Sequence, residues 1–166
     1  KRMGETMCVA WFHQFGIPAK IVRPFHTYGP GMSLDDGRVF ADFVSDIVHN
    51  RNIVMKSDGS VRRAFCYLAD AVRGFFLVLL KGDSGKPYNI GNPEAEVSIA
   101  ELGSLLVGLF PEKNLKVVRK NEDRGEAYLE SPILRNSPDI TLAQQLGWAP
   151  KISVAEGFER TIRSFT

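Results

Sequence analysis

The stretch AKIVRPFHTYGPGM, residues 19–32, decides the fold of this chain. It opens with an apolar run over residues 19–25, preceded by Gly-Ile-Pro, and this pattern predicts a buried strand. Directly after the run come His26, Tyr28, Gly29, Pro30 and Gly31, more specific chemistry than a plain surface turn needs. Because ligands of open α/β sheets bind beyond the ends of strands, this strand end is a candidate site.

A helical pattern precedes the strand. Met3, Met7, Ala10 and Trp11 fall on one face of a helix that begins at the first residues and ends at Gly16. Helix, short loop and strand form half of a parallel βαβ unit. The sequence has no initiator Met and no signal peptide, so we expect it to be an internal piece of a longer protein.

Helical and strand patterns alternate along the rest of the chain. We expect strands at residues 52–56, 62–68, within 85–93 and at 115–120, and helices at 38–49, 70–81, 98–110, 138–147 and from 153 onward. Ser98 with Glu101 and Ser153 with Glu156 have the spacing of capping boxes, while residues 121–138 form an irregular, charged segment. This alternation predicts an α/β fold.

Composition excludes several classes of protein. A length of 166 residues favours one domain, with two small lobes possible. The net charge of +2, with no stripe of Lys and Arg, argues against a nucleic-acid binder, so an anionic partner should be a small ligand. The longest apolar run, residues 75–80, is too short to cross a membrane.

Cysteines and histidines give no sign of a disulfide framework or a metal site. Cys8 and Cys66 stand in ordinary helix and strand patterns, which favours a reducing, cytoplasmic compartment. His13, His26 and His49 are scattered without the spacing of metal ligands, so no metal is predicted. The sequence has no GxGxxG motif, and GDSGK at residues 82–86 follows a helix, which favours a plain helix-ending loop.

For each of four side chains, the sequence allows both a functional and a purely structural interpretation. Arg63, on the expected strand 62–68, either presents its guanidinium fork to a diphosphate or faces water. Arg135 is either a loop ligand or, as we favour, an exposed surface arginine. His26 is either a site residue or a structural histidine. Tyr28 is either an acid–base group or, as we favour, part of the packing of the turn.

Six segments, in order, resemble motifs of the extended short-chain dehydrogenase/reductases that modify nucleotide sugars, namely NAD-dependent epimerases, 4,6-dehydratases and UDP-glucuronate decarboxylases. The segments are KRMGE, RPFHTYGP, DDGRVFADFV, RRAFCYLADA, YNIGNPEAEVSIAEL and RNSPDITLAQQLGWAPKISVAEG. KRMGE resembles the continuation of a YxxxK motif, and the last segment resembles R-x-P-D-I-x-x-A-x-x-x-L-G-W-x-P. The resemblance covers essentially the whole chain but only about the C-terminal half of a family member.

The resemblance implies the C-terminal part of an NAD(P)-binding Rossmann fold, one helix and one strand, joined to a small α/β substrate-binding lobe. Residues 1–30 would be the Rossmann remnant, and residues 31–166 would be mainly the lobe, with segments returning to the Rossmann sheet. Lys1 would be the motif lysine, which binds the nicotinamide ribose and lowers the pKa of the motif tyrosine. That tyrosine would precede Lys1, so we expect the fragment alone to be inactive. Pro24 and Phe25 would run beside the nicotinamide of NAD.

The remaining implied residues would bind a nucleotide sugar, with a UDP-sugar expected. Arg63 and Arg135 would bind the diphosphate, Arg38 and Val39 would lie near the nucleotide at a helix start, and His26 would take the place of an asparagine that binds the sugar. Ile53 and Met55 would line the base. Tyr128 is a further substrate-binding candidate. Both His26 and Gly31, which stands where decarboxylases carry Arg, depart from the family pattern.

The function implied is that of an NAD-dependent nucleotide-sugar epimerase or dehydratase, which oxidises the sugar transiently at C4. One alternative is a UDP-glucuronate decarboxylase. Another, from a different class, is a non-catalytic module that binds nucleotide sugar or mediates association. The resemblance also implies a homodimer formed through the first helix, because this helix belongs to a dimer-forming bundle in the family.

Overall fold

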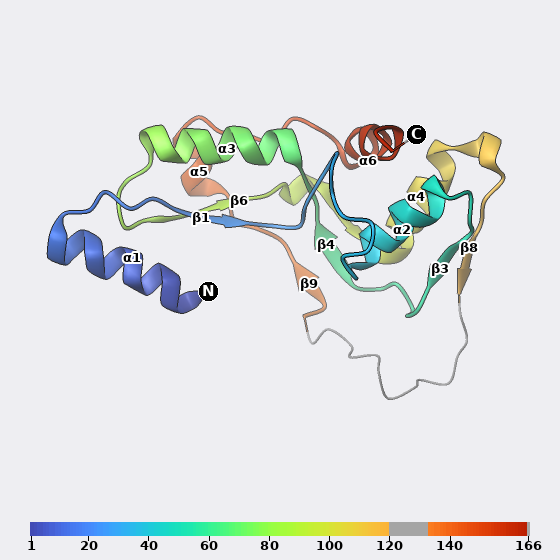
Figure 1. Cartoon of the computed structure of the whole chain (residues 1–166), viewed down its shortest axis with the longest axis horizontal. Helices are drawn as coiled ribbons and strands as arrows, with labels where there is room; N and C mark the ends of the chain where they lie inside the picture. The colour runs from blue at the N-terminus through green and yellow to red at the C-terminus, as the bar shows by residue number, and fades with distance from the viewer. Residues whose placement is uncertain (120–132, 166) are drawn as a thin grey trace.

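The computed structural model describes residues 1–119 and 133–165, which form two lobes lying side by side (Figure 1). The first lobe holds a parallel pair of strands, β1 (Ile21–Pro24) and β6 (Pro87–Ile90), in a register that runs from Ile21↔Pro87 to Pro24↔Ile90. Helix α1 (Arg2–Phe15) lies on one side of this pair, and α3 (Leu68–Lys81) and α5 (Thr141–Gln145) lie on the other. The helix and strand predicted for residues 1–25 are therefore present.

The second lobe packs three helices against short strands. The helices are α2 (Val39–Val48), α4 (Ile99–Leu109) and α6 (Val154–Arg163). In one sheet, β3 (Ile53–Met55) and β8 (Val117–Arg119) run parallel to each other. A second has the order β7-β4-β9, with β4 (Arg62–Ala64) between β7 (Glu96–Ser98) and β9 (Arg135–Asn136). Two 3-10 turns, η1 (Pro93–Ala95) and η2 (Pro111–Lys113), complete this lobe.

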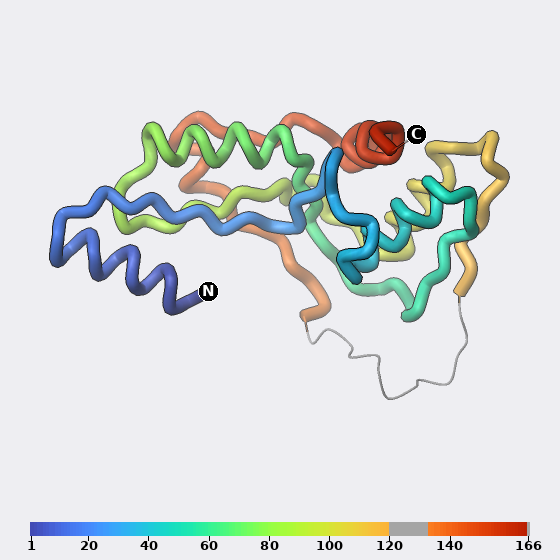
Figure 2. The backbone as a smooth tube through the Cα atoms, viewed as in Figure 1, coloured from blue at the N-terminus to red at the C-terminus, as the bar shows by residue number. Residues whose placement is uncertain are grey.

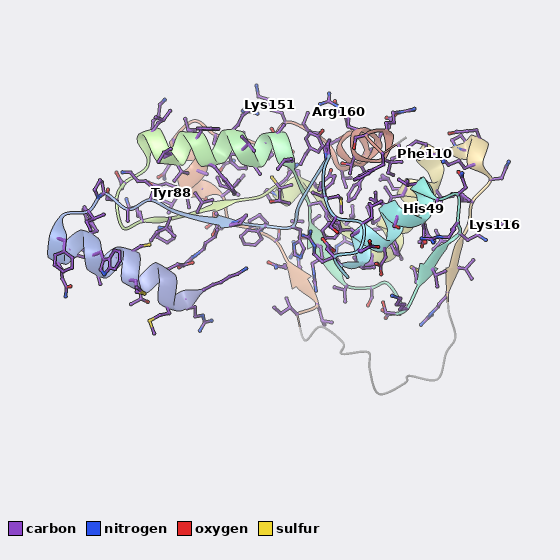
Figure 3. The ribbon with its side chains drawn as sticks, viewed as in Figure 1. His49, Tyr88, Phe110, Lys116, Lys151 and Arg160 are labelled. Atoms are coloured by element: carbon purple, nitrogen blue, oxygen red, sulfur yellow. The ribbon has the colours of Figure 1, made fainter. Side chains whose placement is uncertain are left out.

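Each lobe has its own apolar core. The larger core, in the second lobe, includes Phe43, Ile53, Phe65 and Phe110. The smaller core, in the first lobe, includes Val78, Tyr88, Ile90, Ile140 and Trp148. Tyr88 and Phe110 mark the two regions in Figure 3. Segments after residue 67 and near residue 140 thus return to the first lobe, as the tube in Figure 2 shows.

The single strand predicted over residues 62–68 is wrong, because the chain changes partners at Phe65. Before Phe65, β4 pairs with β7 and β9; after it, β5 (Cys66–Tyr67) pairs with β2 (Thr27–Tyr28). At the break the Phe65 amide donates to Ala95 O and the Cys66 amide donates to His26 O, both at 3.2 Å. The change carries the backbone from the second lobe back toward the first.

Helix ends follow local hydrogen bonding. The Ser98–Glu101 capping box is formed in both directions, whereas at α6 only the Ser153 hydroxyl accepts, from the Glu156 amide. Helix α5 is shorter than the predicted 138–147, because it begins only after its N-cap Ile140 and ends at Gln145; in the turn before it, the Asp139 carboxylate accepts from the Thr141 amide at 2.9 Å. No helix within the described ranges is both long and apolar enough to span a bilayer.

Candidate functional site

A pocket of about 350 Å³ opens between the end of the first lobe and the second lobe. Four residues singled out from the sequence line it, namely His26, Arg38, Val39 and Arg63. They come from three places: the chain between β1 and β2, the start of α2, and strand β4. The remaining lining residues are Phe40, Ser57, Asp58, Ser60, Val61, Phe65, Ile99 and Leu134. Two arginines and one histidine therefore meet over a largely aromatic and aliphatic floor.

Arg63 reaches the pocket because of strand alternation. Val61, Arg63 and Phe65, two residues apart, all line it, so they share one face of the β4 segment. The Arg63 Nη1 donates to the Arg62 carbonyl oxygen at 2.8 Å, which fixes the guanidinium in place. Partial burial lowers the pKa of Arg63, yet an arginine stays protonated at neutral pH. The pocket therefore contains a fixed positive charge.

Arg38 stands at the N-terminus of α2 and has the extended backbone of an N-cap residue. Its Nε donates to the Asp36 carboxylate at 2.6 Å, and this arginine holds the pKa of Asp36 below its usual range. The guanidinium carbon lies 4.6 Å from the centre of the Phe40 ring. Arg38 is thus already paired with Asp36, and the Ala41 amide donates to the Arg38 carbonyl oxygen. No side chain caps this helix end, so its Val39 and Phe40 amides can donate to an anion in the pocket.

His26 follows β1; its backbone is held by a hydrogen bond, but one of its ring nitrogens has no partner among the described residues. Its carbonyl accepts from the Cys66 amide, and its ring lies edge-on to Phe65 at 5.9 Å between centroids. The Nδ1 atom is buried and has no hydrogen-bond partner among the described residues. Burial, followed by the charges of Arg63 and Arg38, lowers the pKa of His26, so the ring is neutral at pH 7.

Arg135 does not reach this pocket. Its Nε donates to both oxygens of Glu96, at 2.9 and 3.0 Å, and the same carboxylate accepts from Arg62 Nε at 3.1 Å. Arg135 first, and then Arg62, hold the pKa of Glu96 below its usual range. Arg62 alternates with Arg63 along β4, so this ion cluster occupies the face of the sheet opposite the pocket.

The two residues expected to line the base, Ile53 and Met55, do not line this pocket. Ile53 is 0% exposed in the larger core, and Met55 packs against that core partly buried. Neither is among the residues that line the pocket. Tyr128 lies outside the described residues. The turn at residues 57–60 was missed as a site element, although its Ser-Asp-Gly-Ser sequence is typical of loops that offer hydroxyl and carboxylate groups.

Tyr28 belongs to the packing of the turn, as favoured from the sequence. It is 3% exposed and stacks on Phe158 with 3.9 Å between ring centres. Its hydroxyl donates to the Val154 carbonyl oxygen at 3.3 Å. Burial raises the pKa of Tyr28, so it does not serve as a proton acceptor at neutral pH. The described residues also contain no cluster of potential metal ligands.

The three residues expected at the cofactor lie at the N-terminus and at the carboxyl end of β1. Lys1 is exposed, and its ammonium bonds to no described side chain or carbonyl. Pro24 is exposed and Phe25 half-buried, with the Phe25 amide fixed on Ile90 O at 2.9 Å. A free ammonium suits ribose hydroxyls and two ring faces suit a nicotinamide, so these residues fit that end of NAD. The sequence has no GxGxxG motif for the cofactor diphosphate.

Comparison with known proteins gives this arrangement a family. Residues 1–91 match the model of the NAD dependent epimerase/dehydratase family. Among curated proteins, UDP-glucuronic acid decarboxylases 6 and 5 of Arabidopsis thaliana are each 36% identical to this chain over 159 residues, which is 95% of it. These matches span 43% and 44% of the two relatives, so the chain has less than half of their length.

Solved structures agree with this family. UDP-glucose 4-epimerase from Thermotoga maritima, in complex with UDP-glucose, matches 99% of this chain and 51% of its own, with a TM-score of 0.84 and 26% identity. UDP-glucuronic acid 4-epimerase from Bacillus cereus, in complex with UDP-glucuronic acid and NAD, matches 99% of this chain and 50% of its own, with a TM-score of 0.81 and 27% identity. The predicted Rossmann-related α/β fold is confirmed, and the chain belongs to the NAD dependent epimerase/dehydratase family.

Proposed function

We propose that the whole protein is an NAD-dependent enzyme that acts on UDP-glucuronic acid through transient oxidation at C4 of the sugar. The observation that carries this proposal is the pocket in which Arg63, Arg38 and the uncapped N-terminus of α2 converge. Two guanidinium groups and free amides suit the diphosphate of a nucleotide sugar. The curated relatives named as UDP-glucuronic acid decarboxylases, and the neighbour solved with UDP-glucuronic acid, support the choice of sugar.

Each element of the pocket has a role in this proposal. Arg63 binds the diphosphate from the strand, while Arg38 and the Val39 amide bind it from the helix. Neutral His26, whose Nδ1 has no hydrogen-bond partner among the described residues, binds a sugar hydroxyl through its ring. Lys1 holds the nicotinamide ribose, and Pro24 with Phe25 supports the nicotinamide. When bound, NAD accepts a hydride from the sugar and returns it.

The reaction branch is decided by the fate of the sugar carboxylate. A decarboxylase releases CO₂ and leaves a UDP-pentose, whereas a 4-epimerase keeps the carboxylate and inverts C4. The names of the curated relatives favour the decarboxylase, and the epimerase is the second candidate. Whole protein incubated with NAD and UDP-glucuronic acid should yield CO₂ and UDP-xylose. UDP-galacturonic acid without CO₂ would assign the epimerase, and no conversion of UDP-glucuronic acid would reject the substrate.

The 166-residue chain by itself is proposed to bind a nucleotide sugar without turning it over. Calorimetry with UDP should therefore give a binding signal that Arg63→Ala removes, while NAD gives none. Tight NAD binding by this chain would contradict the proposal. Two free cysteines fit a reducing compartment, and we propose a cytoplasmic location.

Association through α1 is part of the same proposal. Met3, Met7, Trp11 and Phe15 stand four residues apart, and their side chains are exposed along one stripe of the helix, Met3 by 71%. An apolar stripe of this kind is typical of a protein–protein contact. Sedimentation of the whole protein should show a homodimer that Trp11→Glu dissociates, whereas His13→Glu, on another face of α1, should leave it intact.

A further inference from the structure

Strand β9 presents alternate residues to opposite faces of the β7-β4-β9 sheet. Arg135 pairs with Arg62 and Asn136 pairs with Arg63 in the parallel register of β9 and β4, which lie side by side in Figure 1. Residues that pair directly across neighbouring strands point to the same face. Asn136 therefore shares the face of Arg63, which lines the pocket, and Arg135 shares the face of Arg62.

Side-chain contacts support this assignment independently. Glu96 bonds to Arg135 and Arg62, and the Ser137 hydroxyl also hydrogen-bonds to it, so residues 135 and 137 face the same side. Leu134, one residue before Arg135, lines the pocket. Leu134 thus lies on the pocket side of the sheet and Arg135 on the other face, while Asn136, which is not itself a lining residue, lies on the face of Arg63 at the edge of the pocket.

The Asn136 side chain is accessible and uncommitted. Asn136 is half-buried, and its side-chain amide makes no hydrogen bond with any described residue. A primary amide offers two N–H donors and one acceptor, and here it stands beside a fixed guanidinium. A phosphate oxygen that binds Arg63 would have this second donor within the same strand pair.

We infer that Asn136, rather than Arg135, is the residue of β9 that binds the ligand, by donating from its amide to the diphosphate that Arg63 holds. This inference rests on the proposed function, because it takes a nucleoside diphosphate group as the occupant of the pocket. Arg135 is a structural partner of Glu96 on the other face, and its exposed guanidinium belongs to the ion cluster.

The test compares single variants of the whole protein by calorimetry, with UDP and uridine as probes. Asn136→Ala should weaken UDP binding about tenfold, the effect of losing one hydrogen bond to a charged group, and should leave uridine binding unchanged. Asn136→Asp should weaken UDP binding further, because it places a negative charge beside the phosphate. The matched control is the neighbouring Arg135→Gln, which should leave UDP affinity within about twofold of the parent protein.

The outcomes distinguish a failure of the Asn136 assignment from a failure of the proposed diphosphate pocket. If Arg135→Gln lowers UDP affinity while Asn136→Ala does not, the assignment of faces is overturned. Equal loss of UDP and uridine binding in Asn136→Ala would also overturn it, because a phosphate contact does not act on uridine. Arg63→Ala is the separate arm for the proposed function: unchanged UDP affinity there would reject the diphosphate pocket itself. Matching near-ultraviolet circular dichroism of the variants checks that all of them fold.

Discussion

Gly157 on α6 lies directly against Tyr28: a Cβ at Gly157 would clash with the Tyr28 hydroxyl oxygen and stand 2.9 Å from the ring carbon that bears it. Both residues are buried, and the tyrosine ring stacks on Phe158, the next residue of the helix. The absence of a side chain at position 157 therefore lets α6 pack on the turn that leaves the first lobe.

Gly157→Ala should destabilise the chain by about 1–3 kcal/mol, the usual cost of overpacking a core, because the ring cannot move away without giving up its stack. Chemical denaturation monitored by fluorescence measures this change. Tyr28→Phe removes the nearest clashing atom, so the double variant should be more stable than the sum of the two single changes allows. Strict additivity would show that the contact is not what limits position 157.

Asp70 joins α3 to the segment before α6. The carboxylate is almost fully buried, and its Oδ2 accepts from the backbone amides of Lys151 and Ile152, both at 2.8 Å. Its Oδ1 accepts from Arg73 Nη1 at 2.8 Å. Asp70→Ala would leave these two part-buried amides without their acceptor, so it should lower the free energy of unfolding by roughly 1–3 kcal/mol. Asp83→Asn, an exposed change near the other end of α3, should leave the unfolding midpoint where it is.

His26 should make stability depend on pH in a predictable direction. Burial, Arg63 and Arg38 lower its pKa in the folded chain, and the acidic side chain Asp58 also lines the pocket. Between the lowered pKa and the ordinary value of about 6.5, the unfolded chain binds more protons than the folded one. The free energy of unfolding should therefore rise with pH through that window and level off above it.

Replacing the ring isolates this contribution. His26→Asn should flatten the dependence below pH 6.5 or so, whereas His13→Asn, on exposed α1, should keep it. Urea titrations at several pH values measure the slopes. A slope that persists unchanged in His26→Asn would assign it to other groups.

Much of the pocket could be predicted from residue patterns. His26 and Arg63 were candidates from the strand end and the strand arginine, Arg38 and Val39 were implied by the family resemblance, and all four line one pocket. The carboxyl end of a strand and the N-terminus of a helix are where α/β folds place ligands. The Ser98–Glu101 capping box and the apolar helix α3 were likewise predicted from the sequence.

The sequence patterns did not predict which strands pair with each other, or which face of a sheet each side chain occupies. The motif R-x-P-D has one residue between Arg and Pro, whereas this chain has Asn136 and Ser137 between Arg135 and Pro138. In a strand, a shift of one residue moves a side chain to the other face, and only the register with β4 shows which residue shares the face of Arg63. The change of partners at Phe65 is also set by contacts distant in sequence, with Ala95 and His26.

Gly59 connects the stability of the second lobe to the pocket. It has a φ of +73° in the turn over residues 57–60, which lines the pocket, and its carbonyl accepts from the Ala100 amide at 3.0 Å. A Cβ at Gly59 would stand 2.9 Å from the Ala100 Cβ and 3.0 Å from its amide nitrogen. Gly59→Ala should therefore push the turn away from α4, lowering both the unfolding midpoint and the affinity for UDP.

The matched control is Gly31→Ala, where φ is +79° but no atom lies within 4 Å of the added carbon. Both variants pay the backbone cost of a left-handed residue, about 1–2 kcal/mol, and only Gly59→Ala adds the clash with α4. The difference between their unfolding free energies thus measures the packing of the turn, and their UDP affinities report whether that packing shapes the pocket. Equal losses of stability and of affinity in the two variants would mean that left-handed strain alone explains both, and that α4 does not position the turn.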